Sequence, residues 1–217
     1  MLNLKLDIKR DRVLTVLCLG AHSDDIEIGC GGTILKLIED YENTAFYWIV
    51  FSSSKNRKEE AEKSAQAFLQ EAKQKSVIIK DFRDGYFPYI GAEIKEYFEE
   101  LKQMVSPNLI LTHYRFDLHQ DHRLISDLTW NTFRDHLLLE YEIPKYDGDL
   151  GVPNVFIPIT KSMCTQKIKY ILNYFRSQHE NQWFSKDTFL SLLRLRGIES
   201  NAREKYAEAY YCRKIIV

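Results

Sequence analysis

The sequence predicts an α/β protein: a single Rossmann-like domain with a mostly parallel sheet flanked by helices on both faces. Short apolar runs alternate with longer helical patterns along the first half of the chain. These apolar runs lack polar alternation, which is typical of strands buried on both faces of a parallel sheet. The chain has 217 residues, 45% of them hydrophobic, so we expect one domain over residues 1–217.

The first half of the chain contains two predicted β-α-β units and a further helix and strand. Strands are predicted from short β-rich runs, and helices from apolar residues at a spacing of three and four. Thr33 is a suitable helix cap after two glycines. In chain order the predicted elements are a strand at Val13–Leu19, a helix from Thr33 to Asp40, a strand at Thr44–Phe51, a helix at Arg57–Lys75, a strand at Val77–Ile79, a helix at Ala92–Val105 and a strand at Leu109–Thr112.

The second half is less regular. Gly148–Pro158 is predicted to be a loop with one short strand at Val155–Ile157, because two prolines flank that apolar run. Helical patterns are predicted at Gln166–Phe175 and Asn201–Cys212. The sequence contains no internal repeat, low-complexity tract or linker.

Composition narrows the classes of function and location. The formal charge of −1 provides no net field for nucleic acid, so no nucleic-acid partner is expected. No apolar run approaches the roughly 18 residues of a membrane span, and Met1–Arg12 lacks the apolar core of a signal peptide. The four cysteines include no Cys-x-x-Cys pair. A cytoplasmic protein is therefore expected, and the sequence indicates no oligomeric state.

Two polar clusters follow apolar strands. Residues 21–25, Ala-His-Ser-Asp-Asp, follow the first predicted strand, and residues 117–122, Asp-Leu-His-Gln-Asp-His, follow the fourth. In a doubly wound sheet the first and fourth strands are neighbours, and ligands bind beyond their carboxyl ends. We therefore expect the two clusters to meet there, although they lie about a hundred residues apart in the sequence.

The residue types indicate metal-assisted hydrolysis. Two imidazoles and one carboxylate suit zinc and leave a position for water. His22 and Asp25 are three residues apart and can face one ion, so Asp24 points elsewhere and is available as a base. Of His119 and His122, one can complete the metal site, and the other can serve the oxyanion or protonate the leaving amine.

A neighbouring carboxylate, Asp121 or Asp117, could orient that second imidazole. Alone, either cluster would usually be a solvated turn, but three of the six histidines converge.

Gly29, Gly31 and Gly32 lack the spacing of a nucleotide loop and stand beside acidic residues, so a packing role is expected for them.

The two clusters resemble motifs of the PIG-L/LmbE-like de-N-acetylase family. Residues 21–33, Ala-His-Ser-Asp-Asp-Ile-Glu-Ile-Gly-Cys-Gly-Gly-Thr, resemble the family's Ala-His-Pro-Asp-Asp-x-Glu-x-Gly-x-Gly-Gly-Thr. Residues 117–122 resemble its Asp-x-His-x-Asp-His. Ser23 stands where proline is usual, which changes the rigidity of the turn but removes no ligand.

The resemblance implies a role for each residue. His22, Asp25 and His122 would bind Zn²⁺, or another divalent cation such as Fe²⁺, and Asp24 would be the general base. His119 would be the oxyanion stabiliser or acid, with Asp121 as its partner. The predicted substrate-binding residues are Arg57, in a segment similar to a family helix start, and Asp117.

The function that follows is a zinc-dependent hydrolase that removes an acetyl group from an N-acetylated amino sugar or its conjugate. A small N-acetylated sugar or glycoconjugate is the expected partner. One alternative is a metal-dependent amidase or esterase with a non-sugar substrate. Another is a noncatalytic nucleotide- or sugar-binding Rossmann module.

Overall fold

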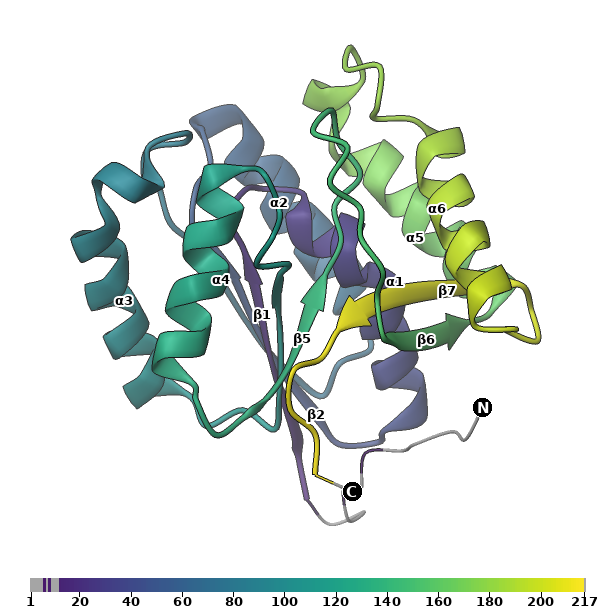
Figure 1. Cartoon of the computed structure of the whole chain (residues 1–217), viewed down its shortest axis with the longest axis horizontal. Helices are drawn as coiled ribbons and strands as arrows, with labels where there is room; N and C mark the ends of the chain where they lie inside the picture. Colours follow the sequence, from purple (N-terminus) through teal and green to yellow (C-terminus); the bar gives the residue numbers. More distant parts are fainter. Residues whose placement is uncertain (1–5, 7, 9–11, 217) are drawn as a thin grey trace.

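Seven strands form one sheet in the computed structural model, which describes residues 6, 8 and 12–216 (Figure 1). Most of Met1–Arg12, the stretch predicted not to be a signal peptide, therefore lies outside the described residues. The strand order is β3-β2-β1-β4-β5-β7-β6. The strands are β1 (Leu14–Gly20), β2 (Thr44–Val50), β3 (Gln74–Ile79), β4 (Leu109–His113), β5 (Leu137–Tyr141), β6 (Val155–Ile159) and β7 (Tyr206–Tyr211).

Helices cover both faces of this sheet. The α-helices are α1 (Asp25–Asp40), α2 (Lys55–Phe68), α3 (Gly91–Met104), α4 (Gln120–Thr132), α5 (Lys161–Tyr174) and α6 (Lys186–Glu199), with 3₁₀ turns at Phe87–Tyr89 and Arg176–Gln178. Alternate residues of β1 face opposite sides. Val16 and Cys18 pack with α1, α2, α5 and α6, whereas Leu17 and Leu19 pack with α3 and α4. The predicted fold class is confirmed.

The sheet is parallel where the predicted site lies. β3, β2, β1, β4 and β5 all run in the same direction, and β1 pairs directly with β4. β7 is antiparallel to both β5 and β6. The predicted strand neighbours are thus confirmed, and the carboxyl ends of β1 and β4 share one edge.

One predicted helix is wrong. Residues 201–212 were expected to be helical, but they contain β7, inserted between β5 and β6. Alanine and glutamate in this segment favour a helix locally. Hydrogen bonding to strands on both sides and burial of Tyr210 override that preference.

Other elements begin elsewhere or were not predicted. α1 begins at Asp25, eight residues before the expected cap at Thr33, so the glycine-rich segment lies inside the helix. α4, β5 and α6 were not predicted. Among the described residues, no helix is long and apolar enough to cross a membrane.

The glycines of α1 allow close packing, as predicted. A Cβ on Gly29 would lie 2.2 Å from the Tyr141 ring, and one on Gly31 would lie 2.6 Å from Phe68. Gly32 lies against Glu208, which accepts hydrogen bonds from the backbone amides of Gly32 and Thr33.

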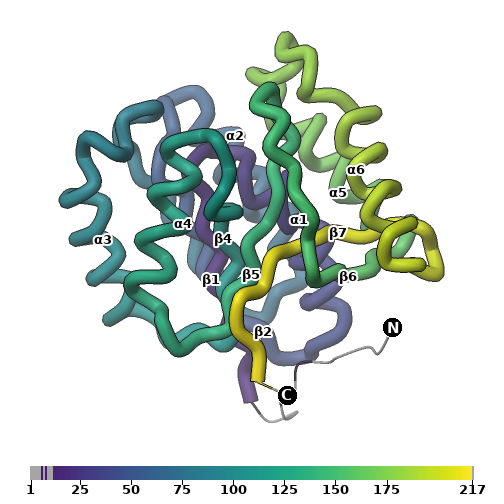
Figure 2. The backbone as a smooth tube through the Cα atoms, in the orientation of Figure 1, coloured from purple at the N-terminus to yellow at the C-terminus, as the bar shows by residue number. Residues whose placement is uncertain are grey.

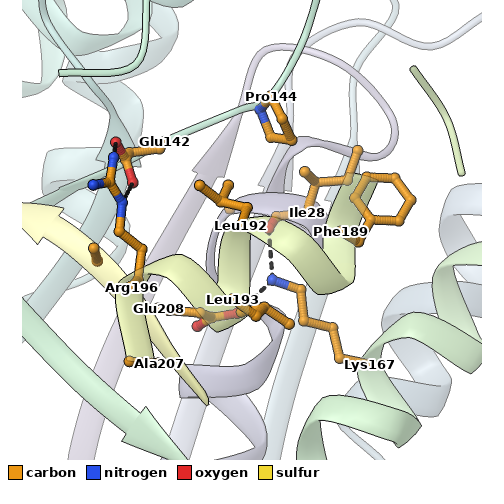
Figure 3. A pocket seen from close by; sticks show the side chains of 12 residues that line it. Ile28, Glu142, Pro144, Lys167, Phe189, Leu192, Leu193, Arg196, Ala207 and Glu208 are labelled. Carbon is orange, nitrogen blue, oxygen red and sulfur yellow. Dashed lines mark hydrogen bonds and ion pairs between the residues drawn. The ribbon is translucent and has the colours of Figure 1, made fainter. Parts of the chain in front are cut away.

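A buried ion pair joins α1 to α5 and β7. Figure 3 shows Lys167 donating to the carbonyl oxygen of Ile28 at 2.7 Å and to Glu208 at 2.6 Å. Nearby, Arg196 of α6 forms an ion pair with Glu142. These side chains line a cavity of about 20 Å³, large enough for about one water molecule, and none of the predicted site residues lines it.

Candidate metal centre

The two polar clusters meet at the carboxyl edge of β1 and β4. Figure 2 shows β1, β4 and β5 next to one another in the middle of the molecule. The turn after β1 carries His22 and Asp24, and Asp25 begins α1. The loop after β4 carries Asp117, and α4 begins behind His119, its N-cap residue. The sheet topology therefore brings these segments together.

The three predicted metal ligands contact one another in pairs. His22 Nδ1 lies 3.1 Å from His122 Nε2 and 3.4 Å from Asp25 Oδ2, and His122 Nε2 lies 3.5 Å from Asp25 Oδ1. In a tetrahedral zinc site with metal–ligand bonds of 2.0–2.1 Å, ligand atoms are about 3.3 Å apart. The residues present therefore fit a tetrahedral metal with one position left open.

Asp24 points away from these three donors, as expected. Its Oδ1 accepts a hydrogen bond from Arg57 Nη2 at 2.8 Å. Burial raises the pKa of Asp24, while the positive charge of Arg57 opposes that rise. Arg57, from α2, thus contacts the candidate base.

His119 lies beside the ligand rings. Its ring centroid is 4.8 Å from that of His22 and 4.6 Å from that of His122. The backbone amide of Asp121 donates to His119 Nδ1 at 3.3 Å, so Nε2 carries the proton of the neutral ring. Burial and the nearby charge of His22 lower the pKa of His119. The ring is therefore a neutral hydrogen-bond donor.

The carboxylate of Asp121 faces His22 instead of His119. Its Oδ2 lies 3.3 Å from His22 Nε2 and accepts from the Gly85 amide at 2.7 Å, and its Oδ1 accepts from the Phe87 amide. Among the hydrogen bonds of the described residues, Asp121 contacts His119 only through its backbone amide. A carboxylate that orients a metal-binding histidine is a common arrangement around zinc.

Asp117 is buried and contacts both histidines of its motif. Its Oδ2 lies 2.9 Å from His122 Nδ1, and its Oδ1 accepts from the His119 backbone amide at 2.8 Å. With 2% of its surface exposed, Asp117 is better placed to orient His122 than to bind substrate.

Two more residues lie within reach of the ligands but are not among those predicted to bind the metal. Asp84 Oδ1 is 3.1 Å from His22 Nε2, and His113 Nε2 is 3.2 Å from Asp25 Oδ2. His113 is fully buried, and its Nε2 accepts from the Ala21 amide at 2.9 Å. That bond occupies the lone pair a metal would need. His113 ends the strand before the second motif, which is the one signal that places it nearby.

Three groups of side chains in this region have ligand atoms that lie within 4.8 Å of one another. They are His22, His119 and His122; Asp25, His113 and His122; and His22, Asp84 and Asp121. All share residues of the same centre.

Comparison with known proteins now identifies the family. Residues 17–133, more than half of the chain, match the PIG-L family model, described as GlcNAc-PI de-N-acetylase. The chain belongs to the PIG-L family. Both polar clusters of the candidate metal centre lie within the matched residues. None of the curated proteins compared with the chain matches it.

Solved structures share the fold of this PIG-L protein at low sequence identity. A conserved protein from Thermus thermophilus superposes with a TM-score of 0.75 at 18% identity, covering 94% of this chain and 96% of its own. GalB, the 4-carboxy-2-hydroxymuconate hydratase from Pseudomonas putida, gives 0.74 at 18%, covering 94% and 97%. N,N'-diacetylchitobiose deacetylase from Pyrococcus horikoshii gives 0.67 at 19%, covering 92% and 84%.

Proposed function

We propose that this PIG-L protein is a zinc-dependent N-deacetylase that acts on an N-acetylated amino sugar or its conjugate. The observation that carries the proposal is that His22 Nδ1, His122 Nε2 and the two carboxylate oxygens of Asp25 make contacts of 3.1–3.5 Å beside a second carboxylate, Asp24. The family match supports removal of an acetyl group from an amide nitrogen. A cytoplasmic location stays a prediction.

Each residue has a proposed task in amide hydrolysis. His22, Asp25 and His122 would hold the cation, which when bound polarises the amide carbonyl and lowers the pKa of water. Asp24 accepts the proton of the attacking water. His119, whose Nδ1 accepts from the Asp121 amide, donates from Nε2 to the developing oxyanion or protonates the leaving nitrogen.

The remaining polar residues orient this machinery. Asp121 holds His22 through Nε2, and Asp117 holds His122 through Nδ1. This differs from the expected pairing of Asp121 with His119 and from a substrate-binding role for Asp117. Arg57 favours the ionised form of Asp24 through its hydrogen bond to Oδ1.

The surroundings of the site support a substrate with an apolar face, such as a sugar ring. Large apolar side chains are exposed on the three loops that follow β3, β4 and β5. Aromatic rings commonly stack on such faces. The exposed residues are Tyr86, Tyr89, Phe116, Leu118, Tyr146, Leu150 and Val152.

The Asp24→Asn variant tests the proposal. We expect kcat to fall by about 10²–10⁴-fold, the usual contribution of a general base, while one metal ion per chain stays bound. Activity is followed as free-amine release from N-acetylglucosamine, its oligomers, its nucleotide and lipid conjugates, and simple acyl amides. Metal content is measured by elemental analysis. Loss of the metal together with activity would refute the division of roles between Asp24 and Asp25.

A second candidate is a metal-dependent amidase or esterase with a non-sugar substrate. The likeness in fold to a hydratase is relevant, because one fold can support different reactions. Turnover of acyl amides or esters without turnover of any N-acetylated sugar would favour this candidate. A chain that binds no divalent cation and releases no amine would favour the noncatalytic module.

A further inference from the structure

Lys145 lies next to the candidate metal centre but belongs to neither sequence motif. It comes from the segment between β5 and β6, which rises beyond the end of β5 and returns to β6 (Figure 1). Its side chain is only 9% exposed. Burying an ammonium group is costly unless carboxylates pair with it. The partners of Lys145 therefore indicate why a lysine stands there.

Two of those partners are aspartates with buried carboxylates, and a third carboxylate, the more exposed Asp147, lies 3.9 Å from Lys145 Nζ. Lys145 Nζ lies 2.9 Å from Asp117 Oδ2 and 2.5 Å from Asp149 Oδ2. Asp149 Oδ2 also accepts from the Leu118 backbone amide at 2.7 Å. The segment between β5 and β6 is thus fastened at two points to the turn that carries Asp117.

Asp117 connects Lys145 to the histidines of the candidate metal centre. Its Oδ2 meets both Lys145 Nζ and His122 Nδ1, at 2.9 Å each, while its Oδ1 accepts from the His119 amide. Donors from separate segments fix the orientation of the carboxylate.

We propose that Lys145 is a positioning residue of the metal centre, holding Asp117 so that His122 Nε2 faces His22 and Asp25. The proposal rests on the proposed function, because it assumes that His122 is a ligand. It adds a residue outside both motifs to the set that determines metal affinity.

Simple charge repulsion predicts the opposite effect. A cation close to a metal site repels the metal, so removing it without a change in geometry should strengthen metal binding. Loss of positioning should weaken it, since outer partners of metal ligands typically affect affinity by about 10–100-fold. The sign of the change in affinity therefore separates the two roles.

The test compares metal affinity in apo-protein variants by competition with a chelating dye for Zn²⁺. For Lys145→Met we expect about tenfold weaker binding, and for Lys145→Arg, which keeps the charge and donors, a change within about threefold. Asp149→Asn leaves the Lys145–Asp117 contact in place and should also stay within about threefold. Lys63→Met, at an exposed ion pair with Glu59, is the matched control.

Cobalt substitution provides a second readout. The visible absorption of Co²⁺ reports coordination geometry, so Lys145→Met should alter the spectrum while Lys145→Arg keeps that of the wild type. Thermal unfolding shows whether each variant folds. If Lys145→Met does not fold, it is replaced by Lys145→Gln, which keeps a hydrogen-bond donor without the charge.

The outcomes distinguish the role of Lys145 from the metal site itself. Equal or tighter metal binding by Lys145→Met, with an unchanged cobalt spectrum, would overturn the role of Lys145 alone. An equal loss in Asp149→Asn and Lys145→Arg would also overturn it, because general loosening of the segment would then be the cause. If His122→Ala binds Zn²⁺ as tightly as the wild type, the proposed metal site itself fails.

Discussion

At the scale of single residues, the environment of Asp24 decides whether it can act as a base. Burial favours its protonated form, and the Arg57 guanidinium, 2.8 Å away, favours the carboxylate. A general base must be ionised to accept a proton. We therefore expect Arg57 to extend the activity of the proposed site toward lower pH.

The Arg57→Met variant tests this effect. Without the guanidinium the pKa of Asp24 should rise further, so the acidic limb of the kcat profile moves to higher pH. We expect a loss of up to about 10²-fold below that limb and recovery above it. Arg57→Lys should keep most of the wild-type profile, because it retains the charge. A loss that is uniform at every pH would show that Arg57 acts on substrate binding alone.

Some residues of the candidate site could be predicted from the sequence and others could not, because only some of them belong to short motifs. His22, Asp24, Asp25, His119 and His122 stand in two short motifs, so spacing and strand order suffice to place them together. Asp84, His113 and Lys145 are single residues that lie outside both motifs in the sequence. They reach the centre through tertiary contacts, which no local pattern encodes.

At the scale of elements, burial on both faces made some strands predictable. β1, β2 and β4 are continuous apolar runs, because helices cover both sides of them. β7 has the sequence Tyr-Ala-Glu-Ala-Tyr-Tyr, which favours a helix by local propensity, and only pairing with β5 and β6 makes it a strand. α1 was predicted too short because Thr33 was expected to cap it after two glycines, whereas these glycines lie inside the helix.

The packing role of these glycines gives a prediction for α1. A Cβ at position 29 would meet the Tyr141 ring at 2.2 Å, and Tyr141 is fixed by a hydrogen bond to the carbonyl oxygen of Leu19. We expect Gly29→Ala to lower the free energy of unfolding by about 1–3 kcal/mol, as overpacking does. Activity should fall as well, since α1 carries Asp25.

The matched control is Gly91→Ala at the start of α3. A Cβ there has only Leu124 within reach, at 3.9 Å. We expect a change between zero and about 1 kcal/mol of added stability, because alanine restricts the unfolded chain. Urea unfolding measures both variants. Equal effects at the two positions would show that glycine flexibility, and not the contact with Tyr141, decides the outcome.

At the scale of the whole molecule, a buried ion pair joins the parallel half of the sheet to its antiparallel edge. Lys167 of α5 and Glu208 of β7, each 3% exposed, bind each other and the backbone of α1. Glu208 accepts from two amides of α1, and Lys167 donates to the Ile28 carbonyl oxygen. The helix that begins at the candidate metal centre is thereby fixed to α5 and β7.

Breaking this pair should destabilise the entire domain. Lys167→Met leaves Glu208 charged and buried without its counter-charge, and a loss of about 3–5 kcal/mol in the free energy of unfolding is expected. Glu208→Gln leaves Lys167 uncompensated in the same way. The double variant removes both charges and should be more stable than the sum of the two single losses predicts. Urea unfolding of the four proteins gives the coupling energy, and strictly additive losses would mean that Lys167 and Glu208 do not stabilise each other.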